Sequence, residues 1–176
     1  MKSIQCSIKG TSGILMHRFP MEPIVNPPIE KRSREDQAEL AAYRDPEGEL
    51  FIPGAAVQRS FVNAATYSKG KGRATLMKPA AAGIFVSPER LLLGTKEYEI
   101  DSRPVVIQKA RIMRHRPVFY DWAVSFRIDY DDSLLIERQV RQIVDDSGAR
   151  VGLLDFRPPC KGPFGRFIVT EWKVIN

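Results

Sequence analysis

The chain has 176 residues and a mass of 19.9 kDa, and 43% of its residues are hydrophobic, which is enough to bury the core of one domain. Its net charge of +6 and its sequence pI of about 9.5 favour nucleic acid as a partner over an acidic membrane surface. Cys6 and Cys160 lack a Cys-x-x-Cys spacing, which argues against a zinc site and a disulfide framework, and no apolar run reaches the roughly 20 residues that span a bilayer. We therefore expect a single domain over residues 1–176, in a cytoplasmic protein with no membrane partner.

The first predicted element is a strand at residues 4–16. Apolar residues alternate with polar ones from Ile4 to Ile8, as in a half-buried strand, and the strand is expected to continue across a glycine irregularity. Prolines then exclude regular structure, so residues 20–47 are predicted to be an irregular, Pro-rich and charged insertion. Within this insertion, residues 29–43 form either a short helix or a mobile excursion.

Residues 50–88 contain no aspartate or glutamate, although 27% of the chain is charged. The segment begins with the apolar run Leu50-Phe51-Ile52, and the following Pro53-Gly54 and alanines predict a sharp turn from an extended entry into a helix. The helix is expected to end in a glycine-containing loop at residues 68–73, which carries lysines and an arginine but no acid. This loop is either a solvated lysine-rich loop or a contact for a polyanion.

Short extended pieces are predicted at residues 83–86 and 90–93, and one longer strand is predicted at residues 105–113. The most regular alternation of the chain follows at residues 122–130, where Trp122 and every second residue after it are large and apolar. A shift of one residue would turn all of these side chains to the other face, so the register of this strand is unambiguous.

A second helix is expected to begin at the N-cap Ser133 and to end at Gly148, with Glu137 and Arg141 as an i,i+4 ion pair. The last predicted strand covers residues 167–175. The residues expected on one of its faces are Ile168, Thr170, Trp172 and Val174.

The order of these elements is strand, helix, strands, helix and strand. It predicts an α+β fold of the ferredoxin-like, RRM-like βαββαβ type, in which an antiparallel sheet carries two helices on one face and irregular insertions extend from it.

A second acid-free segment, residues 102–120, is rich in arginine. The planar guanidinium groups of Arg111, Arg114 and Arg116 suit phosphate recognition, and the neighbouring aromatic residues at positions 119 and 120 can stack on a base. The alternative is a solvated edge strand that is guarded by positive charge.

A third cationic segment, residues 156–167, is a glycine- and proline-rich loop directly before the last strand. Exposed backbone N–H groups in such a loop can face an anion at close range. The loop lacks the Lys-Ser or Lys-Thr ending of a nucleotide-binding P-loop, and Gly162 and Gly165 do not form a dinucleotide fingerprint.

His17 and His115 are the candidate general bases of the chain, because histidine changes its protonation near neutral pH. The alternative for each is a structural role or a contact to nucleic acid. No spacing of acidic residues specifies a metal site, and no cofactor is predicted.

Three separate segments share the features of one known family. Residues 43–61 contain the Pro53-Gly54 helix entry, residues 162–167 form the glycine loop before the last strand, and between them Ile100-Asp101-Ser102-Arg103 is followed by an Arg-His-Arg-Pro-Val-Phe segment at residues 114–119 and a long strand. Together these segments resemble the repeat-associated mysterious protein (RAMP) superfamily, and in particular the RNA-gripping backbone subunits of class 1 CRISPR effector complexes.

The resemblance implies an RNA-recognition-like palm, a thumb-like loop at residues 68–90, and repeated copies that assemble along a guide RNA with other effector subunits in antiviral defence. It implies a nonenzymatic ribonucleoprotein subunit that grips single-stranded RNA without strong sequence preference. No acidic residue is assigned to the cutting of target RNA, so no catalytic residue is predicted. The residues expected to contact RNA phosphates are Arg59, Lys69, Lys71, Arg73, Lys78, Arg111, Arg114, Arg116, Lys161 and Arg166.

Two other functions stay open. One is a RAMP-type endoribonuclease that processes or cuts RNA, with His17 or His115 as its base. The other is a structural or interaction protein of a mobile element, whose cations meet an acidic partner. The nucleic acid is RNA on the first interpretation, with single-stranded DNA as the alternative.

Overall fold

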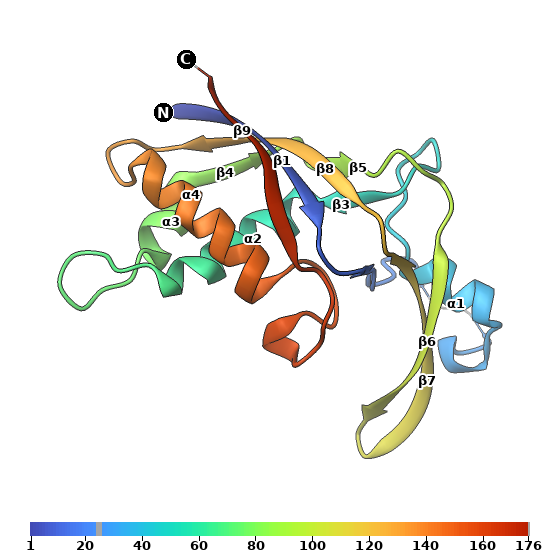
Figure 1. The fold of residues 1–176 in the computed structure, drawn as a ribbon. Helices are drawn as coiled ribbons and strands as arrows, with labels where there is room; N and C mark the ends of the chain where they lie inside the picture. Colours follow the sequence, from blue (N-terminus) through green and yellow to red (C-terminus); the bar gives the residue numbers. More distant parts are fainter. Residues whose placement is uncertain (24–25, 176) are drawn as a thin grey trace.

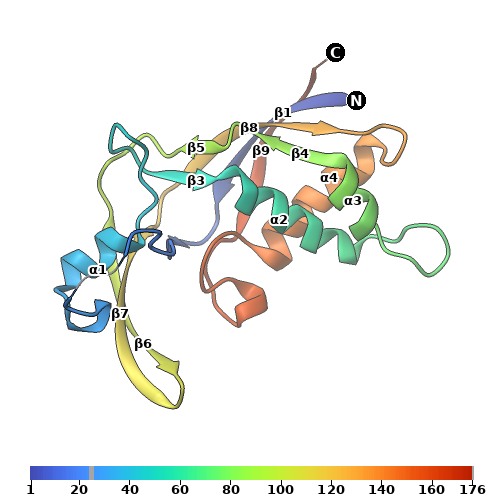
Figure 2. The ribbon, with the colours of Figure 1, turned by 180° about the vertical axis from the view of Figure 1, so that it is seen from behind.

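The computed structural model describes residues 1–23 and 26–175, which form a body and a projecting arm (Figure 1). The arm is the hairpin of β6 (Glu99–Ile107) and β7 (Ala110–Phe119), and α1 (Arg34–Ala41) lies beside it. In the body, a sheet forms one layer and helices cover one of its faces (Figures 1 and 2). These helices are α2 (Gly54–Ala64), α3 (Met77–Gly83) and α4 (Glu137–Asp146).

The sheet of the body has four strands, and all neighbouring strands are antiparallel. Their order in space is β4 (Ile84–Ser87), β8 (Ala123–Tyr130), β1 (Lys2–Gly10) and β9 (Phe167–Ile175). Along the chain, these strands and the two longer helices follow one another as β1, α2, β4, β8, α4 and β9. The predicted α+β class is confirmed.

The helix-covered face of the sheet is the core. Cys6 of β1 lies opposite Phe126 of β8, and both side chains are buried. Phe61 of α2 packs against Phe126 with 6.1 Å between the ring centroids, and Val140 of α4 belongs to the same cluster. Burial of each large apolar side chain contributes roughly 1.5–3 kcal/mol. The alternation predicted for residues 122–130 is therefore confirmed, and it is what attaches the helices to the sheet.

The first long helix begins where the sequence predicts it. β3 (Phe51–Pro53) is the extended entry, and it pairs with β5 (Arg90–Leu92). α2 starts directly at Gly54, where a Cβ atom would lie 2.6 Å from the carbonyl oxygen of Pro88. Glycine therefore allows the helix start to approach the β4–β5 connection closely. The 3-10 turn η2 (Ala65–Tyr67) ends this helical segment.

The strand predicted at residues 4–16 is wrong in its second half. β1 ends at Gly10, where the indole of Trp122 occupies the space that a Cβ atom would need. The indole Nε1 of Trp122 donates a hydrogen bond of 2.8 Å to the carbonyl oxygen of Ser12 and so fixes the bend. The chain then enters β2 (Ile14–Leu15), which belongs to a separate three-stranded sheet with β7 and β6.

The single strand predicted at residues 105–113 is also wrong, because the chain reverses within it. Gln108 and Lys109 have φ angles of 47° and 71°, and they form the turn between β6 and β7. Two consecutive residues with positive φ match the twist of a tight hairpin, although neither is glycine. This turn creates the arm.

The start of the second long helix differs from the prediction. The hydroxyl of Ser133 donates to Asp131 at 2.7 Å in the preceding turn and does not cap a helix. α4 begins after Ile136, whose backbone N–H donates to the side-chain oxygen of Gln139 at 3.0 Å. A glutamine that reaches back in this way satisfies an otherwise unpaired N–H group at the helix start.

The end of this helix differs as well. α4 ends at Asp146, but the helical segment continues past Gly148 through the π-helical turn η3 (Ser147–Val151). Gly148 is needed for packing, since a Cβ atom there would lie 2.1 Å from the carbonyl oxygen of Phe167. The expected Glu137–Arg141 pair is replaced, because Arg141 donates to Asp145 at 3.0 Å.

A β-bulge changes the buried face of the last strand. Ser7 of β1 lies opposite Glu171, but the next residue Ile8 lies opposite Val169, so Thr170 is the extra residue. Before the bulge, Phe167 and Val169 face the core, whereas Ile168 is 55% exposed. The predicted face with Ile168 and Thr170 is therefore wrong in this half of the strand.

The remaining segments connect these layers. The insertion predicted at residues 20–47 contains η1 (Ile29–Lys31) and α1, and its positions 24 and 25 lie outside the described residues. The segment at 68–90, where a thumb is expected, is a short loop followed by α3, which was not predicted, and by β4. The loop at 68–76 projects from one end of the body, and the arm projects from the other (Figures 1 and 2). Over the described ranges, no helix is long and apolar enough to cross a membrane.

The glycine loop before β9 closes onto the body. The backbone N–H of Gly165 donates to the carbonyl oxygen of Gly13 at 2.7 Å, and the N–H of Leu153 donates to the Gly165 carbonyl oxygen at 3.0 Å. Gly165 has a φ of 80°, and a Cβ atom on it would lie 2.2 Å from the carbonyl oxygen of Leu153. Glycine is therefore required here by both conformation and space.

We expect Gly165→Ala to lower the free energy of unfolding by about 3 kcal/mol or more, because strain and a backbone clash act together. Gly48→Ala is the matched control, since Gly48 has a similar φ of 84° but no atom within 4 Å of a Cβ position. Gly48→Ala should lower the free energy of unfolding by only about 1 kcal/mol. Urea denaturation of both variants measures the difference, and equal losses would show that the close approach to Leu153 is unimportant.

Candidate nucleic-acid interface

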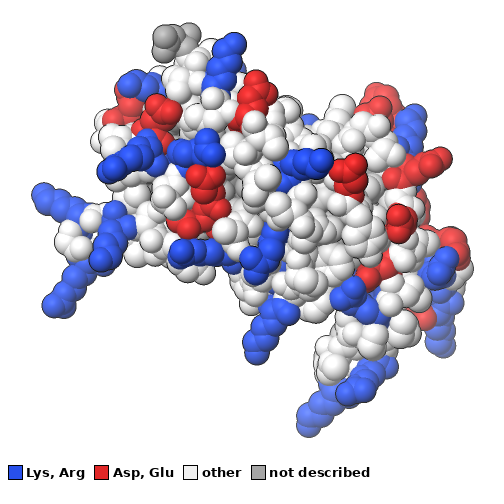
Figure 3. Space-filling view, in the orientation of Figure 1, with Lys and Arg blue, Asp and Glu red and all other residues white. Residues whose placement is uncertain are grey.

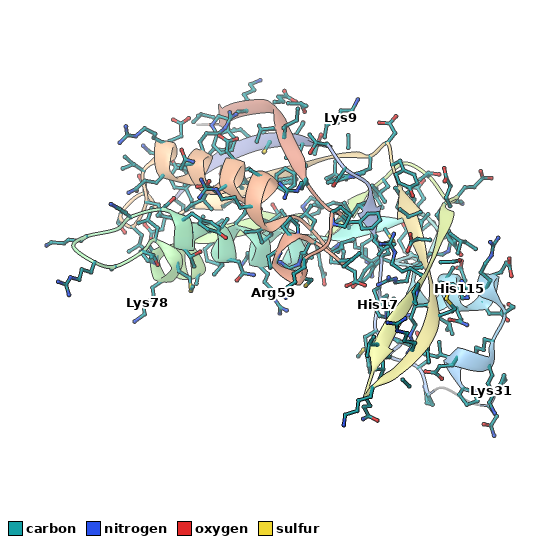
Figure 4. All side chains as sticks on the ribbon, turned by 60° about the horizontal axis from the view of Figure 1, so that its bottom comes forward. Lys9, His17, Lys31, Arg59, Lys78 and His115 are labelled. Atoms are coloured by element: carbon teal, nitrogen blue, oxygen red, sulfur yellow. The ribbon has the colours of Figure 1, made fainter. Side chains whose placement is uncertain are left out.

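Lysine and arginine side chains project from one side of the molecule, from the loop after α2 to the tip of the arm (Figure 3). In the view of this side, Lys78, Arg59, His17 and His115 follow one another from the helices to the arm (Figure 4). Lys9 lies at the opposite edge, on the sheet (Figure 4). The helices and the arm therefore share one cationic side.

The loop after α2 is a small hairpin that displays its cations. Lys69 forms a β-bridge with Thr75, and the N–H of Gly70 donates to the carbonyl oxygen of Ala74 at 2.8 Å. The side chains of Lys69, Lys71 and Arg73 are exposed, and none forms an ion pair with the described residues. They are therefore available to an anion from solution.

Five other predicted contacts are also exposed. Arg59 lies on α2, Lys78 on α3 and Arg111 close to the tip of the arm. Lys161 and Arg166 lie in the glycine loop, where Arg166 donates to the carbonyl oxygen of Ala149. Within the described part of the chain, no ion pair with an acidic side chain joins any of the five.

Arg114 and Arg116 are placed differently, because acidic residues from distant segments reach them. Arg114 is partly buried and donates to Glu30 at 3.1 Å. Arg116 is only 5% exposed and forms an ion pair with Asp155 through its Nη1. The structure thus gives Arg116 an internal role, and its guanidinium does not face a solvent ligand.

The ion pairs of Arg116 belong to a network between the arm and the body. Asp101 lies on β6 of the arm, 4.0 Å from Arg116, and it accepts two hydrogen bonds from Arg103 at 2.6 and 2.7 Å. The guanidinium of Arg103 lies over the rings of Phe156 and Phe164, at 5.0 and 4.9 Å from their centroids. Charge and stacking therefore attach the arm to the glycine loop.

A cleft of about 460 Å³ lies between α2, the end of the insertion at Tyr43, and residues 152–157 before the glycine loop. Its floor is rigid, because the hydroxyl of Ser60 donates to the carbonyl oxygen of Gly152 at 2.8 Å and shares a hydrogen bond of 2.7 Å with Ser147. The polar and aromatic residues that line it are His17, Tyr43, Arg59, Ser60, Asp155 and Arg157.

His17 and Asp155 form the chemically distinctive pair of this cleft. The Nδ1 atom of His17 lies 3.2 Å from Oδ2 of Asp155. Burial raises the pKa of Asp155, but the hydrogen bond with His17, the backbone N–H of Phe156 and the charge of Arg116 outweigh it and lower this pKa to about 2. Asp155 is therefore a carboxylate at neutral pH, and it orients the imidazole with Nε2 directed away from it.

His115 has a different environment. Its Nδ1 atom lies 2.7 Å from the hydroxyl of Ser102, which is directly opposite on the neighbouring strand of the arm. His115 does not line the cleft. Of the two candidate bases, the structure places His17 in the cleft and His115 on the arm.

The glycine loop does not offer its backbone N–H groups to an anion as predicted. The N–H of Gly162 donates to Arg157, that of Phe164 to Phe156, and that of Gly165 to Gly13. The N–H of Arg166 donates to the hydroxyl of Ser12. The loop satisfies these donors internally, because it serves as the connection between the arm, β1 and β9.

Asp155 and Arg157 line the cleft beside His17 and Arg59 but were not predicted as site residues. A signal was present, since Asp155 is an acidic residue inside the apolar stretch Leu153-Leu154-Asp155-Phe156. A charged residue in such a stretch needs a partner when the stretch is buried. The aromatic residues near the arginine segment differ too, because Phe119 is buried and Tyr120 is 60% exposed.

No group of three or more His, Cys, Asp or Glu side chains within residues 1–23 and 26–175 is arranged to hold a metal ion. The charged groups and the imidazole at the cleft are those of Arg59, Arg157, Asp155 and His17. No family model matches this chain, and no curated protein matches it either.

We expect Asp155→Asn to lower the free energy of unfolding by about 3 kcal/mol, because the buried guanidinium of Arg116 loses the charge of its nearest partner. The matched control is Asp145→Asn, which removes the exposed partner of Arg141 and should cost about 0.5 kcal/mol. Urea denaturation at neutral pH measures both losses.

The pH dependence supplies a second readout of the same variant. The pKa of Asp155 in the folded protein lies below its ordinary value of 3.8, so its stabilising effect is complete above that value and is lost as the pH falls towards 2. The stability gap between the wild type and Asp155→Asn should therefore be constant near neutral pH and narrow in acid. A gap that persists unchanged at the acid end would contradict the pairing.

Proposed function

We propose that this chain is a nonenzymatic RNA-binding backbone subunit of a CRISPR-type ribonucleoprotein in antiviral defence, and a divergent relative of the RAMP superfamily. One observation carries the proposal. Exposed cations from α2, α3, the loop at 68–76, the glycine loop and the arm lie on one side of the molecule, without acidic partners among the described residues, and Arg59 of this set lines the cleft. Such a surface suits the backbone of a single-stranded RNA.

The strand order supports a ferredoxin-like, RRM-like palm for this subunit. The sheet order β4, β8, β1, β9 and the chain order β1, α2, β4, β8, α4, β9 are compatible with the βαββαβ plan, with both helices on one face. On this proposal, the helix-covered side and not the open sheet face carries the phosphate contacts. Eight of the predicted contacts remain in this role, because Arg114 and Arg116 are engaged in ion pairs within the chain.

The arm supports assembly along the guide RNA. Its tip exposes apolar side chains beside cations, with Val106 at 67% and Met113 at 48% exposure. Exposed apolar residues on a projecting element are typical of contacts between protein copies. We propose that repeated copies and other effector subunits contact this tip while the cations follow the RNA, in the cytoplasm.

Charge reversal of Lys69, Lys71 and Arg73 to glutamate should weaken RNA binding and flatten its salt dependence. Each lost phosphate contact lowers the slope of log K against log salt by roughly 0.7 for a single strand, so a loss of about two units is expected. A filter-binding titration of a labelled oligoribonucleotide at several salt concentrations measures this slope.

The control reverses Lys9, Arg127 and Lys173, which match the test residues in type and lie on the open face of the sheet. This control should leave the slope close to that of the wild type. If the control lowers the slope as much as the test variant does, binding follows the total charge or uses the open face, and the assignment to the loop fails.

A second candidate function, RAMP-type endoribonuclease activity, is favoured by the pair of His17 and Asp155 in the cleft. A carboxylate that holds Nδ1 leaves Nε2 free to take a proton from a ribose 2′-hydroxyl, and this step needs no metal ion. Cleavage of labelled RNA by the purified protein in the presence of a chelator, lost in His17→Ala and kept in His115→Ala, would support this function. If the RNA stays intact under these conditions, the result contradicts the endoribonuclease and agrees with the nonenzymatic function.

A further inference from the structure

A second groove lies on the other flank of the helical layer, between α4 and the segment that leads from η2 to α3. It encloses about 410 Å³ and shares no lining residue with the cleft of His17. This volume falls in the range of small-ligand sites. The lining residues that matter are Tyr67, Ser68, Lys69, Arg138, Gln142 and Arg150.

One wall of the groove is a stripe along α4 and its π-helical turn. Arg138, Gln142, Asp146 and Arg150 are spaced four residues apart and all line the groove. The only acid of the stripe, Asp146, accepts from Gln142 at 3.1 Å and from Arg150 at 3.3 Å. Its charge is therefore neutralised within the wall.

The facing wall carries a flat aromatic surface. Tyr67 is 51% exposed, and the guanidinium of Arg150 lies 4.8 Å from the centre of its ring. This stacking fixes the tyrosine while leaving part of the ring open to the groove. An aromatic ring with an adjacent guanidinium is a platform on which any of the nucleobases can stack.

Two cations and one hydroxyl of the groove have no partner among the described residues. Lys69 and Arg138 form no ion pair within residues 1–23 and 26–175. The buried Oγ atom of Ser68 has no hydrogen-bond partner either. With Arg150 balanced by Asp146, the groove keeps a net positive charge that only an anionic ligand can offset.

We propose that this groove binds one nucleotide unit of single-stranded RNA. The base stacks on Tyr67, and the phosphate lies between Lys69 and Arg138. An acidic peptide would use the cations but not the aromatic platform, which is why a nucleotide fits better. The inference deepens the proposed function and rests on it for the source of the nucleotide, since a free nucleoside monophosphate offers the same chemistry.

The test measures the affinity of a fluorescein-labelled single-stranded oligoribonucleotide by polarisation and that of AMP by calorimetry. Tyr67→Leu should weaken RNA binding about tenfold through lost stacking, and Arg138→Gln should weaken it and lower the salt slope by roughly one phosphate contact. The matched controls are Phe85→Leu, an exposed aromatic residue of β4, and Arg141→Gln, which lies on α4 outside the groove. Both controls should stay within about twofold of the wild type.

The two ligands separate the outcomes. Loss of RNA affinity in Tyr67→Leu and Arg138→Gln, but not in the controls, supports a nucleotide within an RNA chain. Loss of AMP binding with unchanged RNA affinity overturns the assignment to RNA and shows a free nucleotide as the ligand of the groove. If both variants bind RNA and AMP as the wild type does, the groove is not a nucleotide site, while charge reversal of Lys71 and Arg73, which lie outside the groove, still tests the proposed function separately.

Discussion

The ion pair between Arg116 and Asp155 holds the arm on the body. The guanidinium of Arg116 is buried between Asp101, on the neighbouring strand of the arm, and Asp155, in the segment before the glycine loop. Removal of such a charge from water is unfavourable, so the two carboxylates must stay close to it. Because Asp155 also accepts from His17, the same cation sets the position of the arm, one wall of the cleft and the orientation of its histidine.

Local patterns in the sequence predicted most of the body. The alternation in β8 and the Pro53-Gly54 entry of α2 depend on neighbours in the chain, and both agree with the structure. The errors lie where a distant residue decides the local conformation. Trp122 ends β1 at Gly10, and the carbonyl oxygen of Phe167 packs on Gly148 without ending the helix. Thr170 adds a bulge that no alternation pattern shows, because only the partner strand defines the count of residues.

The candidate site was predictable only in part, because here too residues from distant segments decide the outcome. A segment without acidic residues leaves its cations unpaired only if no acid arrives from elsewhere, and this holds for Lys69, Lys71 and Arg73 within the described residues. In the arginine-rich arm it fails, since Glu30 and Asp155 are supplied by other segments. The three cationic segments therefore differ in kind. The loop after α2 displays its charge, the arm pairs Arg114 and Arg116 within the chain but displays Arg111, and the glycine loop displays its cations while its backbone N–H groups are satisfied within the chain.

The hydrogen bonds of Ser60 to Ser147 and Gly152 join α2 to the π-helical turn. Arg59 and Gly152 lie at the cleft, and Arg150 lies at the groove, so this junction separates two recesses by a short, stiff piece of backbone. Side chains can reorient, but the spacing between the two recesses cannot change without breaking buried hydrogen bonds. An RNA strand that occupied both recesses would therefore have a fixed distance between the nucleotides bound in each of them, and the protein would set that distance.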